Sequence, residues 1–156
     1  MATARHSAHD VGRDRFLDAA ADRLRTAGQR STPARVALVG VLGRSGRPLT
    51  IPEILAADRE FAQSSVYRNL VVLEQAGVVH RIVTNGGFAC FELTEDLTGD
   101  HHHHLICSEC GAVQDVPASA AIERALHHAV EAIERASGFH TTAHRIDLVG
   151  RCRDCG

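Results

Sequence analysis

The sequence predicts an α+β protein with an N-terminal winged helix-turn-helix domain and a C-terminal α/β domain. After a first helical pattern, three further short helical patterns are followed by a β-hairpin pattern, and this order is typical of a winged helix. The second half carries four consecutive histidines and two Cys-x-x-Cys pairs, within DHHHHLICSECG and the terminal CRDC. A chain of 156 residues is long enough for two such small domains.

The first two helices are indicated by apolar spacing and by their end signals. Residues 1–12 are polar and are expected to be disordered. Apolar residues recur at helical spacing over residues 13–27, and a glycine follows them. Thr32 and Pro33 then supply an N-cap and a first helical residue. The chain therefore begins its ordered part with two consecutive helices.

The next two helices complete the helix-turn-helix pattern. Thr50 and Glu53 form a capping box at the start of a short helix. Ser64 or Ser65 is expected to start the last helix, SSVYRNLVVLEQAG, which Gly77 ends. An unrelated helical bundle is the alternative, and the hairpin that follows these helices favours the winged helix.

The expected hairpin consists of VVHRIVT and FACFEL around the turn residues NGG. A three-residue turn places His80 opposite Glu92 and Ile82 opposite Cys90, so that His80, Cys90 and Glu92 share one face. A two-residue turn would instead place Cys90 opposite Arg81 and disperse the set. The register of this hairpin therefore decides which polar side chains meet.

The domain boundaries follow from these patterns. A winged-helix DNA-binding domain is expected over residues 13–93, and a polar hinge, TEDLTGD, is expected over residues 94–100. A metal-binding domain is expected over residues 101–156. Within the last domain, two short strands flank the first cysteine pair. A helix is expected from about residue 120 to 136, and residues 139–149 read as a strand.

Composition limits the classes of function. Residues 1–93 carry 12 Arg and 9 Asp or Glu, a net charge of +3, whereas residues 94–156 carry 5 Arg and 10 acidic residues, a net charge of −5. This asymmetry of charge suggests that the two halves of the chain have different functions. A solvated surface of mixed charge is the alternative. No apolar run approaches the roughly 18 residues of a membrane helix, and the first residues lack the core of a secretory signal. We therefore expect a cytoplasmic protein without a membrane partner.

The two Cys-x-x-Cys pairs are the strongest chemical signal. In a reducing cytoplasm, cysteines at this spacing are typical of a metal site rather than of disulfides. Two pairs complete a tetrahedral S4 site, which suits a structural Zn²⁺. Free structural cysteines or redox dithiols are the alternatives. The predicted ligands are Cys107, Cys110, Cys152 and Cys155.

The histidine block predicts two further metal sites. In an extended strand successive side chains alternate between faces, so His102 and His104 point one way while His101 and His103 point the other way. His102 and His104, which lie just beyond the hinge, would join His80, Cys90 and Glu92 of the hairpin, which is the wing of the winged helix. Together they would form a mixed site of N, S and O atoms, which favours zinc over iron or manganese. The predicted ligands of this hinge site are His80, Cys90, Glu92, His102 and His104.

The third predicted site lies within the C-terminal domain. His101 and His103 are expected to pair with Glu123 of the helix and His144 near the last strand. For His144 a surface or core role is the alternative, just as Cys90 and His80 are alternatively ordinary packed residues.

The last helix of the first domain is the predicted recognition helix. A winged helix directs the N-terminal residues of this helix toward base edges in the major groove. Arginine reads guanine through two hydrogen bonds, and serine hydroxyls contact phosphates. Core packing is the alternative for Tyr67, the only tyrosine. The predicted DNA-binding residues are Arg35, Ser64, Ser65, Tyr67 and Arg68.

Five stretches of the chain occur in an informative order and spacing: TPARVALVGVL, SSVYRNLVVLEQAGVVHRI, FACFELT, HHHHLICSECG and CRDC. In this combination they resemble the ferric uptake regulator family over residues 13–156. The resemblance implies a homodimeric, metal-dependent transcriptional repressor that binds double-stranded DNA with a palindromic operator. It implies that the C-terminal α/β domain is the dimerisation domain, that the S4 zinc is structural and that the hinge site is the sensor. Tyr67 and Arg68 match the base-contacting pair of the family.

The resemblance also bears on which metal is sensed. Iron and manganese members usually take a histidine from the loop in the region of Pro48, Leu49 and Thr50, and this chain has Pro48 there. His80 and Cys90 instead match the pattern of zinc-responsive members. Glu92, within FELT, resembles the iron-type motif, so Cys90 and Glu92 compete for one ligand position. We expect a zinc-sensing repressor of metal uptake genes. The alternatives are iron, manganese or peroxide sensing, with Fe²⁺ or Mn²⁺ at the hinge site.

A zinc metalloenzyme is a remote alternative. It would use an open zinc site in the histidine block to activate water, with Glu92 or Glu123 as the base. No recognisable nucleophile or substrate-binding motif accompanies these residues, so we do not expect an enzyme.

Overall fold

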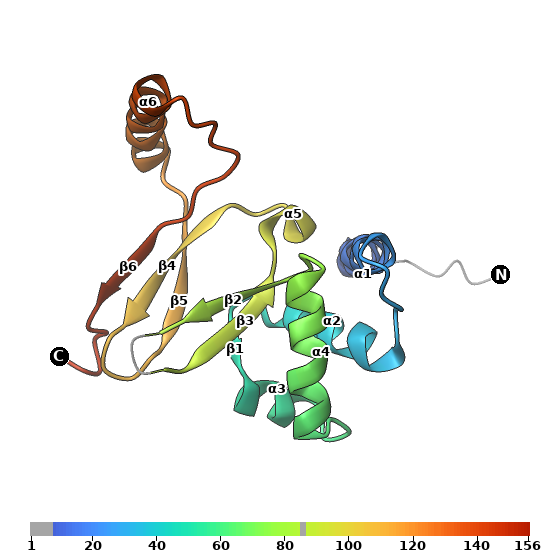
Figure 1. Ribbon diagram of the computed structural model, residues 1–156. Coiled ribbons are helices and arrows are strands. Elements are labelled where there is room, and N and C mark those ends of the chain that lie inside the picture. Colours follow the sequence, from blue (N-terminus) through green and yellow to red (C-terminus); the bar gives the residue numbers. More distant parts are fainter. Residues whose placement is uncertain (1–7, 85–86) are drawn as a thin grey trace. The chain divides into compact units, whose positions relative to one another are not determined.

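The structure is a computed structural model that describes residues 8–84 and 87–156 (Figure 1). The chain divides into two compact units, residues 1–100 and 101–156, each described by itself below. Of the segment 1–12 that was predicted to be disordered, residues 1–7 lie outside the described residues. The first helix begins at Ala8 rather than near Arg13.

The first unit contains five helices and three strands in its described residues. In chain order these are α1 (Ala8–Thr26), α2 (Pro33–Ser45), β1 (Leu49–Thr50), α3 (Ile51–Ala57), α4 (Gln63–Gln75), β2 (Val79–Val83), β3 (Ala89–Leu93) and α5 (Glu95–Thr98). The predicted mixed class of helix and sheet is confirmed. The sequence signals missed the two shortest elements, β1 and α5, because two to four residues are too few to show a periodic pattern.

The sheet of this unit is antiparallel, in the order β1-β3-β2. His80 lies opposite Glu92, and Ile82 lies opposite Cys90. The Thr84 N–H donates to the Phe88 carbonyl at 2.9 Å and continues this register toward the turn, where residues 85–86 lie outside the described residues. The register expected for a three-residue turn is therefore the observed one.

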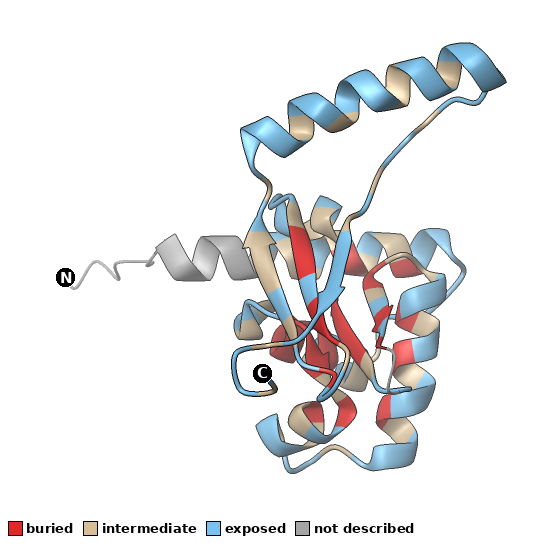
Figure 2. Cartoon of the chain, turned by 90° about the vertical axis from the view of Figure 1, so that its left-hand side faces the viewer, coloured by how far each residue is buried: buried red, intermediate tan, exposed pale blue. Residues whose placement is uncertain are grey.

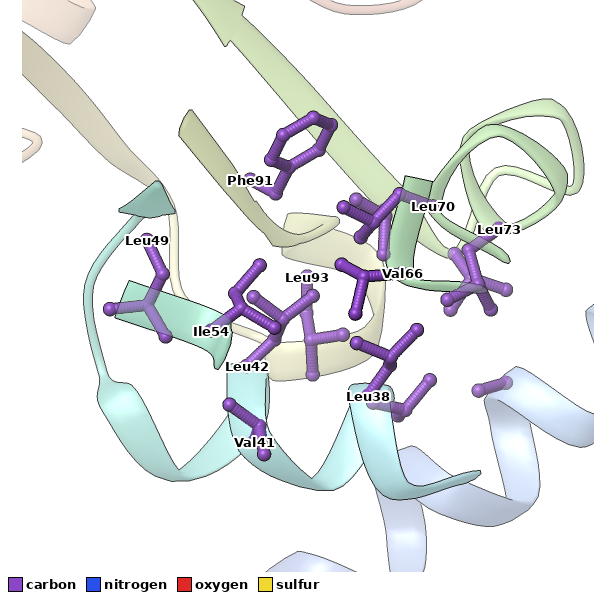
Figure 3. Close-up of a cluster of buried hydrophobic side chains, with 14 of the residues drawn as sticks. Leu38, Val41, Leu42, Leu49, Ile54, Val66, Leu70, Leu73, Phe91 and Leu93 are labelled. Atoms are coloured by element: carbon purple, nitrogen blue, oxygen red, sulfur yellow. The ribbon is translucent and has the colours of Figure 1, made fainter. Parts of the chain in front are cut away.

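The hydrophobic core lies between the helices and one face of this sheet. Figure 3 shows leucine and valine side chains of α2 and α4 converging with Ile54 of α3 and with Phe91 and Leu93 of β3. Ile54 and Leu73 are completely buried. Burying a side chain of this size contributes about 1.5–3 kcal/mol. The core therefore fixes α4 against the sheet, and this sets the orientation of the helix expected to meet DNA.

The helix starts agree with the sequence signals at two places and differ at a third. The Thr32 hydroxyl accepts from the Arg35 N–H, and Thr50 and Glu53 form both arms of a capping box. The start of α4, however, is Gln63 with Ala62 as N-cap, and no side chain caps it. The expectation that Ser64 or Ser65 caps this helix is therefore wrong, and both serines lie inside its first turn.

Arg23 of α1 ties the end of α4 to the start of α5. One guanidinium nitrogen, Nη1, donates to the Gly77 carbonyl at 2.5 Å and to the Thr94 hydroxyl at 3.0 Å. The other, Nη2, pairs with Asp96 at 3.2 Å. The segment that was predicted to be a polar hinge therefore begins with a short helix that is bonded to its own unit.

The second unit contains β4 (His102–Cys107), β5 (Val113–Pro117), α6 (Ala120–Ser137) and β6 (Asp147–Gly150). Its sheet has the order β5-β4-β6, in which β4 pairs antiparallel with β5 and parallel with β6. The predicted strand over residues 139–149 is wrong for most of its length, since only Asp147–Gly150 is strand. The strand β4 is therefore central, and its side chains face both sides of the sheet.

The helix α6 is amphipathic, yet the described residues of its own unit leave none of its side chains buried. The Ser119 hydroxyl accepts from the Ile122 N–H at 3.2 Å and caps its start. Every residue of α6 is described, and none is buried, as the exposed and intermediate colours of Figure 2 show. Large apolar side chains of this unit, including Ile133 and Phe139, are more than half exposed. Over the described residues, no helix is long and apolar enough to span a membrane.

Candidate metal centres

The four predicted zinc ligands meet at one end of the second unit. The four Sγ atoms of Cys107, Cys110, Cys152 and Cys155 all lie within 4.8 Å of one another. The Sγ atoms of Cys110 and Cys152 are 3.8 Å apart. A tetrahedral site with Zn–S bonds of about 2.3 Å has an edge of about 3.8 Å. The cysteine cluster therefore fits a tetrahedral zinc ion.

Backbone geometry builds this cluster from two tight turns. The Gly111 N–H donates to the Cys107 carbonyl at 3.0 Å, and the Cys155 N–H donates to the Cys152 carbonyl at 3.1 Å. The Ser108 N–H donates to the Gly150 carbonyl at 2.7 Å and holds the two turns together. Each turn thus directs two thiols toward the same point.

The thiols of this cluster have unequal acidities. Backbone N–H groups of Cys110 and Cys152 donate to the Cys107 sulfur and lower the pKa of that thiol to about 6. Hydrogen bonds with the Cys152 and Cys110 side chains raise the pKa of the Cys155 thiol to about 12. Four adjacent thiolates repel one another, so a cation is required before all four can be deprotonated together.

A second cluster contains the four residues predicted for the third site. The ligand atoms of His101, His103, Glu123 and His144 lie within 4.8 Å of one another. The Nε2 atoms of His101 and His144 are 3.0 Å apart, and Nε2 of His103 is 2.8 Å from Glu123 Oε1. Converging imidazole nitrogens and a carboxylate are the donor set of a first-row divalent metal.

The charges and hydrogen bonds of this second cluster also fit a cation. Burial raises the pKa of Glu123, but the hydrogen bond with His103 and the charges of His144 and His101 outweigh it and lower that pKa below its ordinary value. The carboxylate is therefore ionised and available as a ligand. His103 Nδ1 is buried and has no hydrogen-bond partner within the described part of the chain.

The other face of β4 presents His102 and His104 toward Asp115 of β5. The two imidazole rings lie edge to face, with centroids 5.1 Å apart. His104 Nε2 lies 4.0 Å from Asp115 Oδ1, and its other nitrogen, Nδ1, lies 3.0 Å from Asp147 Oδ1. Two histidines and a carboxylate are therefore gathered on one side of the sheet of the second unit.

Sequence reasoning did not identify the two aspartates beside His104. Asp115 pairs with His104 across the β4–β5 ladder, and Asp147 pairs with His104 across the parallel β4–β6 ladder. The first pairing could have been read from the hairpin around the first cysteine pair. The second could not, because it depends on the register of a strand more than 40 residues away.

The wing residues are described within the first unit. His80 Nδ1 and Glu92 Oε1 are 3.2 Å apart. Cys90 lies on β3, like Glu92, and is buried. Among residues 8–84 and 87–156 it belongs to none of the clusters with three or more ligand atoms. Burial and the negative charge of Glu53 raise the pKa of the Cys90 thiol. The contact between His80 and Glu92 therefore places an imidazole and a carboxylate together in the wing.

The helix α4 exposes the residues predicted to read bases. Tyr67 is 51% exposed, which excludes core packing for this side chain. Arg68 is exposed, and its Nε donates to the Ser64 carbonyl at 3.2 Å. Asn69 donates to the Ser65 carbonyl at 2.9 Å and accepts from Arg35 Nε at 3.2 Å. Sequence reasoning did not assign Asn69, which links the helices α2 and α4.

Comparisons with known proteins agree on one family. The profile described as "Ferric uptake regulator family" matches residues 26–149. The chain is 31% identical over 144 residues to the "Ferric uptake regulation protein" of Bacillus subtilis (strain 168), covering 89% of this chain and 93% of that protein. It is 33% identical over 138 residues to the "Peroxide-responsive repressor PerR" of Staphylococcus aureus (strain USA300), covering 85% and 86%.

Solved structures give the same result. The chain matches the Helicobacter pylori ferric uptake regulator with a TM-score of 0.68 and 27% identity, covering 89% of this chain and 93% of that one. That structure is described as revealing three functional metal binding sites.

Proposed function

Because the chain belongs to the ferric uptake regulator family, we propose that it is a repressor whose binding to a palindromic operator depends on a metal ion. Regulators of this family respond to metals, bind DNA as dimers and are not enzymes. The observation that carries the proposal is the cluster of His102, His104 and Asp115 on β4 and β5. The regulated genes would be those of metal uptake, and the compartment the cytoplasm.

We assign the regulatory metal to this cluster. Two imidazoles and a carboxylate suit Fe²⁺, Mn²⁺ or Zn²⁺, and added carboxylate oxygens favour the harder Fe²⁺ and Mn²⁺. By sequence resemblance alone, the remaining ligands come from His80 and Glu92 of the wing. We place Cys90 second to Glu92 as a ligand, because Cys90 belongs to none of the clusters of three or more ligand atoms among the described residues, whereas Glu92 Oε1 lies 3.2 Å from His80 Nδ1. Iron or manganese is therefore the first candidate for the sensed metal.

Zinc sensing is the second candidate. His80 supplies a further imidazole beside Glu92, and a site richer in nitrogen suits zinc. Cys90→Ser separates the two candidates when metal-dependent DNA binding is measured. If Cys90 is a zinc ligand, this variant loses its zinc response, whereas Glu92→Gln leaves much of it. If iron or manganese is sensed, Glu92→Gln instead loses its metal-dependent DNA binding, and Cys90→Ser keeps it.

Peroxide sensing is a variant of the iron proposal that the 33% identity to a peroxide-responsive repressor favours. Iron bound by His102 and His104 would then oxidise one of these ligands after exposure to peroxide. Mass spectrometry of the iron-loaded protein tests this, because it would detect added oxygen on either histidine. Unmodified histidines after peroxide treatment would exclude it.

The other two clusters have separate roles in this proposal. The four cysteines hold a structural Zn²⁺ that closes the second unit, because an S4 site leaves no open coordination position. The cluster around Glu123 holds a third metal ion. The exposed apolar residues of α6 and β6 form the dimer face: Ile122, Ile133, Leu148 and Val149. Ile133→Glu is expected to shift the sedimentation coefficient from dimer to monomer.

A gel-shift titration tests the whole proposal. Protein whose S4 zinc content has been verified is titrated with Mn²⁺, Zn²⁺, or Fe²⁺ without oxygen, on a palindromic DNA. We expect tight binding only with metal, and its loss in His104→Ala. Binding of equal strength in a mild chelator, with the S4 zinc retained, would refute metal dependence.

A further inference from the structure

The imidazole of His104 is contacted by a different carboxylate on each side. Its Nδ1 is 3.0 Å from Asp147 Oδ1, and its Nε2 faces Asp115 Oδ1 at 4.0 Å. The first distance is that of a hydrogen bond, whereas the second is too long for one. The ring itself is buried, with 2% of its side chain exposed, so its orientation is fixed. The two nitrogens of His104 therefore have different roles.

From this geometry we propose that Asp147 is a positioning residue that makes Nε2 of His104 the metal-binding atom. A neutral imidazole carries one N–H, and the hydrogen bond made by one nitrogen decides which nitrogen keeps its lone pair. A carboxylate only accepts hydrogen bonds, so Asp147 requires the proton on Nδ1. The lone pair then lies on Nε2, on the side of Asp115. This inference rests on the proposed role of His104 as a regulatory ligand.

The same contact increases the strength of the ligand. A carboxylate that accepts from the N–H of a metal-binding histidine raises its basicity and fixes its ring, and loss of such a partner typically weakens metal binding about 10- to 100-fold. Parallel pairing between β4 and β6 places Asp147 opposite His104, so the sheet itself fixes the contact. Asp147 is thus a determinant of metal affinity that contacts the metal only through His104.

A purely structural role predicts a different result. The Asp147 side chain is 41% exposed, and an exposed ion pair contributes little to stability. If Asp147 only supported the sheet, its replacement would lower stability and metal binding together. If it positions His104, metal affinity falls while the melting temperature stays close to that of a charge-matched control.

The experiment uses the full-length dimer with the S4 zinc retained. Glu123→Gln is introduced to disable the metal site formed by His101, His103, Glu123 and His144. Binding of Mn²⁺ is followed by the electron paramagnetic resonance signal of the free ion. Asp147→Asn and Asp147→Ala are compared with Asp18→Asn, the same charge change at an exposed position of α1. We expect a 10- to 100-fold increase in the Mn²⁺ Kd for both Asp147 variants and none for the control.

A second readout reports the proton directly. Long-range ¹⁵N–¹H spectra of the protein without regulatory metal should show the Nδ1–H tautomer of His104 in the parent protein and a shift toward Nε2–H in Asp147→Ala. An unchanged tautomer, or a Kd within threefold of the parent, would overturn the role of Asp147. If His104→Ala also leaves the Kd unchanged, the regulatory site itself is wrongly assigned, which is a separate failure.

Discussion

Asn69 connects the recognition helix to the residue that we expect to contact the DNA backbone. Its side-chain oxygen accepts from Arg35 Nε at 3.2 Å, and its amide nitrogen donates to the Ser65 carbonyl at 2.9 Å. Arg35 Nη1 also donates to the Arg30 carbonyl at 2.5 Å. Two nitrogens of the Arg35 guanidinium are therefore held by the protein. The third, Nη2, has no hydrogen-bond partner among the described residues, and we expect it to contact a phosphate oxygen.

Asn69→Ala and Arg35→Ala should weaken DNA binding in different ways. Each arginine that neutralises a phosphate contributes about 0.9 to the slope of log K against log salt, so Arg35→Ala lowers the slope of a dimer by about 1.8. Asn69→Ala removes no charge and leaves this slope unchanged. It requires Arg35 to be ordered on binding, at a cost of about 0.5–1.5 kcal/mol for each half-site. For the dimer this corresponds to about 5- to 150-fold weaker binding.

Fluorescence anisotropy with a labelled palindromic DNA, measured between low and moderate salt, checks both effects. Alanine favours helix more than asparagine does, so Asn69→Ala should not unfold α4. Gln75→Ala, at the exposed end of the same helix, serves as the control for a polar-to-alanine change. Wild-type affinity in Asn69→Ala, or an unchanged salt slope in Arg35→Ala, would refute this reasoning.

Four further predictions concern packing, capping, acid dependence and zinc. A Cβ atom at Gly43 would lie 2.5 Å from Phe16 Cζ, so Gly43→Ala should lower the free energy of unfolding by about 1–3 kcal/mol in urea, with partial recovery in the Phe16→Leu double variant. Thr50→Ala removes the capping box and should cost about 1 kcal/mol in the same assay. Burial raises the pKa of Glu53, but bonds from Arg47 and Thr50 outweigh it and leave that pKa below 4.5. The contribution of the ionised Glu53 carboxylate to the free energy of unfolding is therefore present above pH 4.5 and is lost as pH falls through the lowered pKa of the folded state. Glu53→Gln should abolish this part of the acid dependence. Cys152→Ser should lose one equivalent of zinc by elemental analysis and most of the protection of the second unit in hydrogen exchange.

Local signals in the sequence predicted the features that local chemistry controls. The capping box of α3 and the N-cap of α2 depend on side chains that bond backbone groups three residues away, so their spacing is visible in the sequence. The register of the wing follows from turn length and alternation, which are local as well. The expected cap of α4 failed because serines also occur inside a first turn, where Ser65 accepts from Asn69.

The composition of the sites depended on contacts that are distant along the chain. Asp147 meets His104 only because β6 pairs in parallel with β4, and such a register has no local signature. Cys90 was assigned from the register of the wing and from its match to zinc-responsive members, and its burial could not be read from the sequence. Alternation along the histidine block was foreseeable from strand geometry, and the ring pairs His101–His103 and His102–His104 both lie 5.1 Å apart.

The strand β4 couples the cysteine cluster to the histidine that we assign to metal sensing. Cys107 ends this strand, and its sulfur accepts from the Cys152 N–H at 3.4 Å just beyond β6. A zinc ion bound by the four cysteines, as we propose, would therefore fix the ends of β4 and β6 together, and the same pairing places Asp147 against His104. A metal that binds only the folded unit stabilises every contact of that unit. We therefore expect the proposed structural zinc to support the geometry of His104, so that the affinity of the proposed regulatory site would depend on an ion that this site does not contact.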